Sequence, residues 1–487
     1  MIIIQLNKRD FEYDTHSLVK AFYPEEEVAI RYEGETEESP FRLKISLFYG
    51  EKEIEILFTE ADGTVVKRET EAVEYEADRK ETKNHLKYRL YLMLQEYTGT
   101  SLPWGTLTGI RPTKIPMALL EQGMSNKDIA EYMRKTYLIS PQKTALGISI
   151  ANRERHILRD IDYKDGYSLY VGIPFCPTIC LYCSFSSSPL SMWKDKVDGY
   201  LDALCKEIAF GGEAYKGKTL DTVYIGGGTP TTLNPEQLER LLSEIEKHFD
   251  LSKVKEFTVE AGRPDSITEE KMRVIKNHPV TRISINPQTM NQKTLDVIGR
   301  RHTVEETKEA FLMARRIGFD NINMDLIVGL PGEGKDEVEH TLKEVIALDP
   351  DSITVHSLAV KRAARLNMFK DQYKEMTFLN NMEIMEMTER YCMEAGQYPY
   401  YLYRQKNMAG NLENVGYAKP GKEGIYNILI MEEKQSILAL GAGASTKVVA
   451  AADKIDRIEN VKDIKNYMER IDEMIERKRQ GFMKYGK

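Results

Sequence analysis

Three of the chain's five cysteines stand close together, at Cys176, Cys180 and Cys183. They follow a short apolar run, and the segment from Tyr170 to Phe185 reads YVGIPFCPTICLYCSF. Thiolates in C-x3-C-x2-C spacing on one loop can face one centre and supply three corners of a tetrahedral or cubane site. Such sites usually take four ligands, so three cysteines predict a centre with one open position. An open position is typical of a site that does chemistry on a bound ligand.

Two other interpretations of these cysteines stay open. They could complete a zinc site with a fourth ligand from elsewhere, although no His or Cys follows within the next dozen residues after Cys183. They could also be buried free thiols. Their tight clustering in a chain with so few cysteines favours an iron–sulfur centre. Cys205 and Cys392 lie in helix-like patterns, which favour the role of a small buried apolar residue.

The composition limits the class of protein. A chain of 487 residues predicts two or three domains, and 41% hydrophobic with 30% charged residues indicates a soluble globular protein. The net charge of -8 and the lack of a strongly basic block argue against nucleic-acid binding. No uncharged apolar run reaches the roughly 18 residues of a membrane span, and the N-terminus does not resemble a signal peptide. An odd number of cysteines favours the reducing cytoplasm.

The first 160 residues predict two segments. Residues 1–75 alternate apolar and polar side chains in short runs, which predicts an antiparallel sheet, and residues 84–97 have helical spacing. We therefore expect an N-terminal α+β domain over residues 1–100. A helical connector is expected over residues 101–160, and it begins with a loop rich in Gly and Pro from Pro103 to Pro116. Its helices are predicted at 125–136, with Ser125 as N-cap, and at 141–159.

Residues 161–375 alternate short β-rich runs with amphipathic helical stretches. Six such units require parallel strands with crossover helices, so we predict the α/β class and a partial (βα)6 TIM-like barrel. Loops at the carboxyl ends of parallel strands converge on one mouth, and the cysteine loop follows the first strand. The six strands are expected near residues 168, 222, 257, 281, 322 and 352.

Residues 376–487 predict a mainly helical C-terminal region, and we expect this region to cover the substrate if the chain is an enzyme. The run ALGAGAS, from Ala439 to Ser445, is too rich in Gly for a regular helix, and it indicates close approach of its backbone to a ligand or to a neighbouring element. The highly charged helical pattern from Val461 to Gln480 is typical of a solvated face.

Several polar residues follow the predicted strands at the mouth. The run from Gly226 to Pro230 reads GGGTP and allows backbone groups to approach a ligand closely, although a tight turn would also use it. Glu260 follows the third strand, Gln288 the fourth, and Arg300 stands one helix later. Asp325 lies inside the apolar fifth strand, where a carboxylate is costly without partners, and a structural ion pair is the alternative.

Taken together, these motifs resemble a known family. The cysteine spacing, with the aromatic Tyr182 before the last cysteine, resembles the signature of the radical S-adenosylmethionine (SAM) superfamily. Tyr170 and the run IPFC ending at Cys176 are similar to oxygen-independent coproporphyrinogen III oxidase. The likeness covers about residues 168–360. The longer N-terminal region resembles the HemZ branch, which is named as a coproporphyrinogen dehydrogenase.

The resemblance implies a [4Fe-4S] cluster on the three cysteines, with SAM bound beside it. It implies that Tyr170 lies at the cluster end of the first strand as a catalytic and cofactor-binding residue. Gly227, Gly228 and Thr229 would hold the amino group of the methionyl moiety. Carboxylates suit ribose hydroxyls and ammonium, and an arginine suits the SAM carboxylate. The remaining implied SAM contacts are Tyr182, Glu260, Gln288, Arg300, Asp325 and Ala359.

The implied reaction starts from SAM cleavage to methionine and a 5'-deoxyadenosyl radical, which abstracts hydrogen from a propionate of coproporphyrinogen III. Loss of CO2 and one electron leaves a vinyl group, and two rounds give protoporphyrinogen IX. A low-potential donor of the flavodoxin or ferredoxin type and an electron acceptor are the implied partners. The tetrapyrrole carries four carboxylates, so basic residues are expected near it. The candidates are Arg111, Lys114, Arg404 and Lys406.

Two positions depart from the oxidase pattern. Gly172 stands where that pattern has a histidine, and Phe185 stands where it has an additional cysteine. Relatives with these changes include proteins other than proven oxidases. Another tetrapyrrole-handling radical SAM protein, such as a haem chaperone or a haem-modifying methyltransferase, is therefore an alternative. A non-catalytic iron–sulfur module is disfavoured, because a structural cluster needs no SAM pocket.

Overall fold

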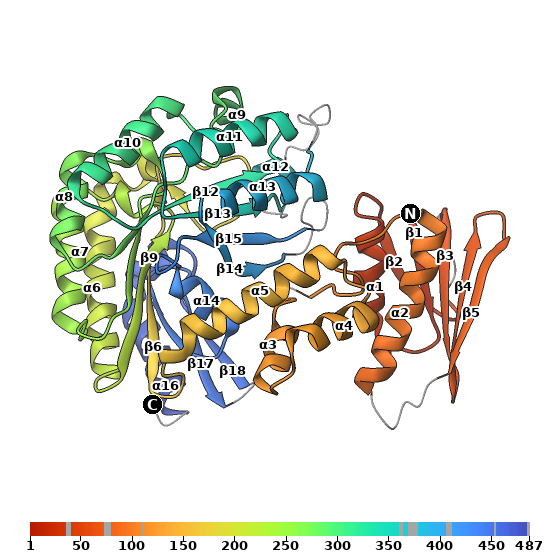
Figure 1. Cartoon of the computed structure of the whole chain (residues 1–487). Helices are drawn as coiled ribbons and strands as arrows, with labels where there is room; N and C mark the ends of the chain where they lie inside the picture. Colours follow the sequence, from red (N-terminus) through yellow and green to blue (C-terminus); the bar gives the residue numbers. More distant parts are fainter. Residues whose placement is uncertain are drawn as a thin grey trace. The chain divides into compact units, whose positions relative to one another are not determined.

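The computed structural model describes residues 1–35, 40–72, 79–109, 111–359, 364–368, 378–405, 412–451 and 454–484 (Figure 1). The chain forms two compact units. The first comprises Met1–Asn152 with Arg404–Leu412, and the second comprises Arg153–Tyr403 with Glu413–Lys487. The boundaries of these two units differ from those of the four segments expected from the sequence. Residues 101–152 pack with the N-terminal domain, and the strands after residue 413 join the barrel sheet.

The first unit begins with a five-stranded sheet of order β2-β1-β3-β4-β5. Its elements are β1 (Ile2–Leu6), α1 (Glu12–Phe22), β2 (Val28–Tyr32), β3 (Leu43–Tyr49), β4 (Glu53–Glu60), β5 (Val65–Ala72) and α2 (Arg79–Thr98). The β3, β4 and β5 strands are antiparallel as predicted, but β1 pairs parallel with both β2 and β3. The prediction of an antiparallel sheet is thus wrong for β1. The unpredicted helix α1 carries the chain back, so β2 runs in the direction of β1.

Three helices follow in the connector: α3 (Lys114–Glu121), α4 (Asn126–Tyr137) and α5 (Pro141–Ile157). The predicted N-cap is confirmed, because the Ser125 side chain accepts a hydrogen bond from the backbone N–H of Asp128. Helix α5 starts at Pro141, where a missing N–H costs nothing in the first turn.

The second unit contains the predicted partial (βα)6 barrel. Strands β6, β9, β10, β11, β12 and β13 are neighbours in chain order, and every pair among them is parallel. The helices between them cover the outer face of the sheet (Figure 1). The elements are β6 (Gly166–Ile173), α6 (Val197–Ala214), β9 (Thr219–Gly227), α7 (Pro235–His248), β10 (Glu256–Glu260), α8 (Glu269–Asn277), β11 (Arg282–Ser284), α9 (Gln292–Val297), α10 (Val304–Ile317), β12 (Ile322–Val328), α11 (Lys335–Ala347) and β13 (Ser352–Ser357).

The C-terminal region adds helices and also strands that the sequence did not predict. These elements are α12 (Arg365–Met368), α13 (Met382–Glu394), β14 (Tyr398–Tyr403), β15 (Asn414–Ala418), α14 (Ile425–Glu432), β16 (Ser436–Leu440), β17 (Ser445–Ala451), β18 (Lys454–Glu459), α15 (Ile464–Glu469) and α16 (Ile471–Met483). Strands β15 and β14 continue the sheet antiparallel beyond β13. On the other side β16 pairs parallel with β6 and is followed by β17 and β18.

The Gly-rich turn after β16 approaches the end of β6 closely, as its composition predicted. Gly441 has a φ of 106°, and a Cβ there would lie 2.6 Å from the carbonyl oxygen of Gly172. Only glycine fits a position that combines this φ with this contact.

Helix α14 contacts both β9 and β14, so it lies across the inner side of the curved sheet. None of the helices in the described ranges is long and apolar enough to cross a membrane.

Candidate active site

The cysteine loop is closed at its base by two short strands. Strand β7 (Phe175–Cys176) pairs with β8 (Ser188–Pro189), so both ends of the loop are held together. Within the loop the N–H of Cys183 donates to the carbonyl of Cys180 over 3.1 Å. The backbone N–H of Leu181 donates to Ile298 in the segment after α9, over 2.9 Å. The three cysteines therefore stand on a loop that is fixed at its base and at its middle.

Two arginines set the charge around Cys180. The Nη1 of Arg263 donates to the Sγ of Cys180 over 3.4 Å, and Asp265 holds the same guanidinium through two bonds of 2.9 and 2.6 Å. Burial alone would raise the pKa of the Cys180 thiol, but the charges of Arg300 and Arg263 outweigh it and the pKa lies below its usual value. A low pKa favours the thiolate, which is the form that binds metal.

Arg263 was missed by the sequence analysis. It stands three residues after Glu260, in the loop that follows the third barrel strand, so its position in the mouth was available as a signal. Its partner could not be read from the sequence, because Cys180 is 83 residues away.

The surroundings of Cys176 and Cys183 favour the thiolate form less than those of Cys180 do. Burial raises the pKa of both thiols, that of Cys183 to about 11, while the Thr229 hydroxyl donates to the Sγ of Cys176 over 3.6 Å. All three cysteines are free of disulfides. In the described ranges no three His, Cys, Asp or Glu side chains are grouped around a single ion. A cubane does not need such a group, since each cysteine binds a different iron, so the loop fits a cluster.

The glycine run after β9 is fastened to the base of the cysteine loop. The N–H of Gly228 donates to the carbonyl of Ile173, and that of Thr229 to the carbonyl of Phe175, both over 2.7 Å. A Cβ at Gly228 would lie 2.5 Å from the Phe175 oxygen, and Gly227 has a φ of 107°. Side chains are therefore excluded on steric grounds, and the turn and the loop are positioned as one piece.

Glu260, at the end of β10, is held by a tyrosine that the sequence analysis did not select. The Tyr224 hydroxyl donates to its carboxylate. The Tyr224 ring stacks on Tyr426 of α14 with centroids 4.5 Å apart and on Tyr170 of β6 at 6.3 Å. Burial, together with the nearby Asp325 charge, raises the pKa of Glu260 to about 7 against the lowering effect of the Tyr224 hydrogen bond.

This raised pKa predicts that Glu260→Gln stabilises the SAM-free protein at alkaline pH. In the unfolded chain Glu260 ionises near the usual glutamate pKa of 4.5, so its raised folded pKa destabilises the fold increasingly as pH rises toward 7. We expect glutamine to remove a penalty on the order of 2–3 kcal/mol above pH 7 and to have almost no effect near pH 4.5. Urea unfolding at both pH values measures this, and an equal effect at both would contradict it.

Asp325 and Gln288 are linked by a hydrogen bond between their backbones. The N–H of Gln288 donates to the Asp325 carbonyl over 2.9 Å, and Gln288 holds an unusual φ of 68°. The Asp325 carboxylate accepts from Asn323 over 2.7 Å and lies 3.8 Å from the Nε2 of His356. Burial alone would raise the pKa of Asp325, but His356 and Asn323 hold it below its usual value. The Oε1 of Gln288 is buried with no hydrogen-bond partner in the described residues.

Arg300 is buried beside the cysteine loop. Its Nη1 donates to the Asn286 carbonyl over 2.5 Å, while its buried Nε has no hydrogen-bond partner in the part of the chain described. The half-buried Tyr182 packs against Leu181 and the residues around it, and its pKa is raised by burial against the Arg300 charge. Ala359 follows the end of β13 and is half-buried. The orphaned polar atoms on Gln288 and Arg300 fit a site that takes a polar ligand.

The predicted residues thus fall into three connected groups at the carboxyl ends of the strands. Glu260 accepts hydrogen bonds from Tyr224 and from the backbone of Gly227, Asp325 is hydrogen-bonded to Gln288 through the backbone, and Arg300 lies beside Cys180. The candidate substrate contacts do not lie among these groups. Lys406 lies outside the described residues, and Arg111, Lys114 and Arg404 belong to the first unit. Arg404 is buried there and donates to the Leu107 carbonyl over 2.6 Å.

The two departures from the oxidase pattern differ in their surroundings. A Cβ on Gly172 would make contacts of 3.4 Å with the Leu440 oxygen and the Tyr170 ring, so a side chain would meet its neighbours at close to ordinary contact distance. Phe185 is 74% exposed, so burial does not explain a large apolar residue there.

The fold and the site define a member of the radical SAM superfamily. The sequence profile of that superfamily matches residues 170–345, which include the cysteine loop and the strands that carry the polar residues. Proteins of the superfamily use a [4Fe-4S] cluster and S-adenosylmethionine, and these are the cofactors that the site fits.

Known relatives narrow the class. The chain is 42% identical to the oxygen-independent coproporphyrinogen-III oxidase-like protein HemZ of Bacillus subtilis, over 95% of this chain and 93% of that protein. It is 32% identical to the haem chaperone HemW of the same organism, over 63% of this chain and 76% of the chaperone. The chain belongs to the oxygen-independent coproporphyrinogen III oxidase-like family, in its HemZ branch. The solved structure of coproporphyrinogen III oxidase (HemN) from Escherichia coli shares the fold, with a TM-score of 0.52 and 24% identity over 66% of this chain and 73% of that one.

Proposed function

We propose that this chain is a radical SAM enzyme that oxidatively decarboxylates propionates of coproporphyrinogen III to vinyl groups and yields protoporphyrinogen IX. The observation that carries the proposal is the 42% identity, over nearly its whole length, to a protein named as coproporphyrinogen oxidase-like. The arrangement of the mouth supports it, because thiols, carboxylates and an arginine come from successive strands of one barrel.

In this proposal Cys176, Cys180 and Cys183 bind the cluster, and Arg263 with Arg300 favour the thiolate at Cys180. When bound, the cluster and SAM supply a carbon-centred radical that takes a hydrogen atom. Six further residues are proposed to contact SAM, in addition to Glu260, Asp325 and Arg300. They are Tyr182, Gly227, Gly228, Thr229, Gln288 and Ala359.

Glu260 and Asp325 accept hydrogen bonds from the ribose hydroxyls or the ammonium of SAM, and Arg300 pairs with its carboxylate. Asp325 suits this role because its pKa is held low, so it is an ionised acceptor at neutral pH. Tyr170 is proposed to act at the cluster end of β6. Burial raises the pKa of its hydroxyl, so the group stays protonated and serves as a hydrogen-bond donor.

The electron balance requires two partners. Converting one propionate to a vinyl group removes CO2, one proton and two electrons, of which one leaves with the abstracted hydrogen atom. The second electron passes to an acceptor, and a low-potential donor of the flavodoxin or ferredoxin type starts each turnover. We place these reactions in the cytoplasm.

The assay that tests the function is anaerobic. The purified chain with a reconstituted cluster is given dithionite and SAM, with and without coproporphyrinogen III. We expect 5'-deoxyadenosine in amounts that follow the substrate, together with monovinyl and divinyl products found by mass spectrometry. Deoxyadenosine without any vinyl product would overturn the proposed substrate and leave the enzyme class intact.

A haem chaperone is the second candidate, because the chain is also similar to HemW over three quarters of that protein's length. A third arm of the assay therefore supplies haem in place of coproporphyrinogen. Stoichiometric haem binding without vinyl product would favour the chaperone. Failure to bind haem, with vinyl product formed, would favour the decarboxylase.

A further inference from the structure

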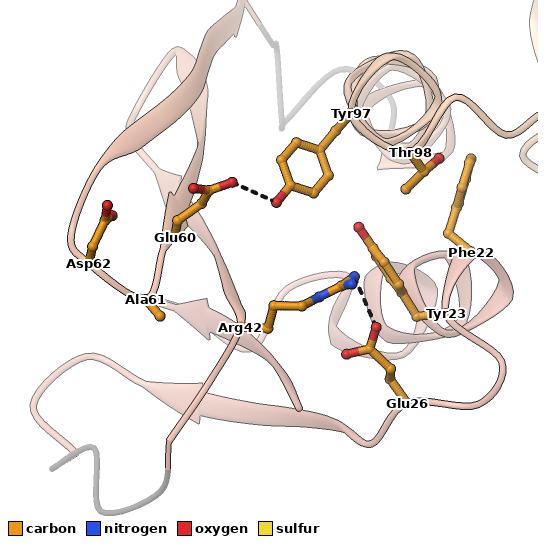
Figure 2. A pocket seen from close by; sticks show the side chains of 9 residues that line it. All are labelled: Phe22, Tyr23, Glu26, Arg42, Glu60, Ala61, Asp62, Tyr97 and Thr98. Carbon is orange, nitrogen blue, oxygen red and sulfur yellow. Dashed lines mark hydrogen bonds and ion pairs between the residues drawn. The ribbon is translucent and has the colours of Figure 1, made fainter.

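The N-terminal domain contains a hollow of about 820 Å3 that the proposed function does not use (Figure 2). It is formed where α1 and α2 end, beside the start of β3 and the hairpin between β4 and β5. All of its walls belong to the first unit. The residues that line it are Phe22, Tyr23, Glu26, Arg42, Glu60, Ala61, Asp62, Tyr97 and Thr98.

One wall carries a guanidinium and an aromatic ring. Arg42 lies over the ring of Tyr23, 5.3 Å from its centroid, and pairs with Glu26 over 2.9 Å. A guanidinium has five N–H donors in a fixed fork, so one partner does not exhaust it. The Arg42 side chain is 57% exposed, which leaves the fork accessible to a ligand.

The Tyr23 hydroxyl is the least expected group in the hollow. Tyr23 is 7% exposed, yet no described residue accepts a hydrogen bond from its hydroxyl, and the nearby Arg42 can only donate. Figure 2 shows this hydroxyl directed into the space between Arg42 and Tyr97. Burial raises its pKa to about 12 against the charge of Arg42, so the group stays protonated. A buried hydroxyl without an acceptor destabilises a fold, and a bound ligand that accepts its hydrogen bond would satisfy it.

The opposite wall carries carboxylates. Glu60 accepts a hydrogen bond from the Tyr97 hydroxyl over 2.9 Å, and Asp62 accepts one from the backbone N–H of Thr64 over the same distance. Neither is within ion-pair distance of a Lys or Arg among the described residues. Helices α1 and α2 both end at this hollow, and helix C-termini favour positive charge nearby.

The hollow is therefore polarised, with hydrogen-bond donors on one wall and unneutralised carboxylates on the other. We propose that it binds a free α-amino acid. Its carboxylate pairs with Arg42 and accepts from the Tyr23 hydroxyl, while its ammonium faces Glu60 and Asp62. Three carboxylates line the hollow against one guanidinium, so neutral and basic amino acids bind more tightly than aspartate or glutamate. This site is independent of the radical chemistry proposed above.

The test is calorimetric titration of the full-length protein with lysine, leucine and glutamate up to millimolar concentrations. We expect lysine or leucine to bind and glutamate to bind at least about tenfold more weakly. The N-acetyl and methyl ester derivatives of the tightest ligand each lose one charge, and both should fail to bind. No binding of any of the three amino acids, or binding by both derivatives as tight as by the parent, overturns the proposal.

Three variants separate the site from the fold. Arg42→Gln removes the carboxylate partner and should weaken binding about tenfold or more. Arg68→Gln is its matched control, because Arg68 also pairs with a glutamate on this sheet, Glu55 at 2.5 Å, but does not line the hollow. Tyr23→Phe should weaken binding and leave the ligand-free protein melting at the same or a higher temperature. Equal affinities in Arg42→Gln and Arg68→Gln would overturn the site.

Discussion

Replacing Cys180 with alanine is expected to abolish binding of the iron–sulfur cluster and all cleavage of SAM. Cys180 is the most buried of the three loop cysteines, and its thiol receives the Arg263 hydrogen bond. With alanine there, two thiolates remain where the loop supplies three. Iron should fall from about four atoms per chain to almost none after anaerobic reconstitution. Iron and sulfide analysis and the visible absorption of the cluster measure the loss.

Cys205→Ala is the matched control for this experiment. Cys205 is also a free, buried cysteine, but it lies on α6 outside the loop. The control should retain the full complement of iron and all deoxyadenosine formation, with a small loss of stability from the vacated volume. The assignment of the cluster to the loop would fail if Cys180→Ala kept its iron or if both variants lost it equally.

Replacing Lys478 with methionine is expected to cost about 3–5 kcal/mol of folding free energy. Lys478 on α16 and Glu207 on α6 are both fully buried, and their Nζ and Oε1 atoms lie 2.7 Å apart. Asn460, Tyr467 and the N–H of Gly441 also donate to the Glu207 carboxylate. Removing the lysine charge leaves a buried carboxylate with neutral donors only.

Lys206→Met is the control, because Lys206 and Asp472 join the same two helices with an ion pair of 2.7 Å that is exposed to solvent. An exposed pair contributes about 1 kcal/mol or less. Urea unfolding followed by circular dichroism compares the two variants. Adding Glu207→Gln to Lys478→Met should recover part of the loss. Equal costs for Lys478→Met and Lys206→Met would show that burial of the pair is irrelevant to stability.

The barrel could be predicted from the sequence because its signals are local. Each parallel strand reads as a short apolar run, and each crossover helix has its own apolar face, so the six units could be counted in order. Helix α1 was missed because it lies between two strand-like runs, although Leu18, Val19 and Phe22 form a buried face with helical spacing. Strands β14 to β18 were missed because their pairing depends on free sheet edges beside β13 and β6, which exist only in the assembled barrel.

The same limit applies to the site. The cysteine spacing and the polar residues after the strands could be found one by one along the chain. The residues that hydrogen-bond to them could not be found in this way. Tyr224 reaches Glu260 because β9 and β10 are neighbours, and Arg263 reaches Cys180 because the loop after β10 lies beside the loop after β6. Those contacts follow from strand order and packing.

The sequence by itself determined the class of chemistry, because the number, type and spacing of the cysteines are local properties of one loop. It also determined the order in which polar residues arrive at the mouth. Only the tertiary structure decided which of those residues lie close enough to change one another's pKa. Lys478 shows the difference most clearly: its charged helical segment predicted a solvated face, yet packing of α16 on α6 buries it against Glu207. Burial and pairing depend on residues distant in sequence, so they are set only when the elements pack.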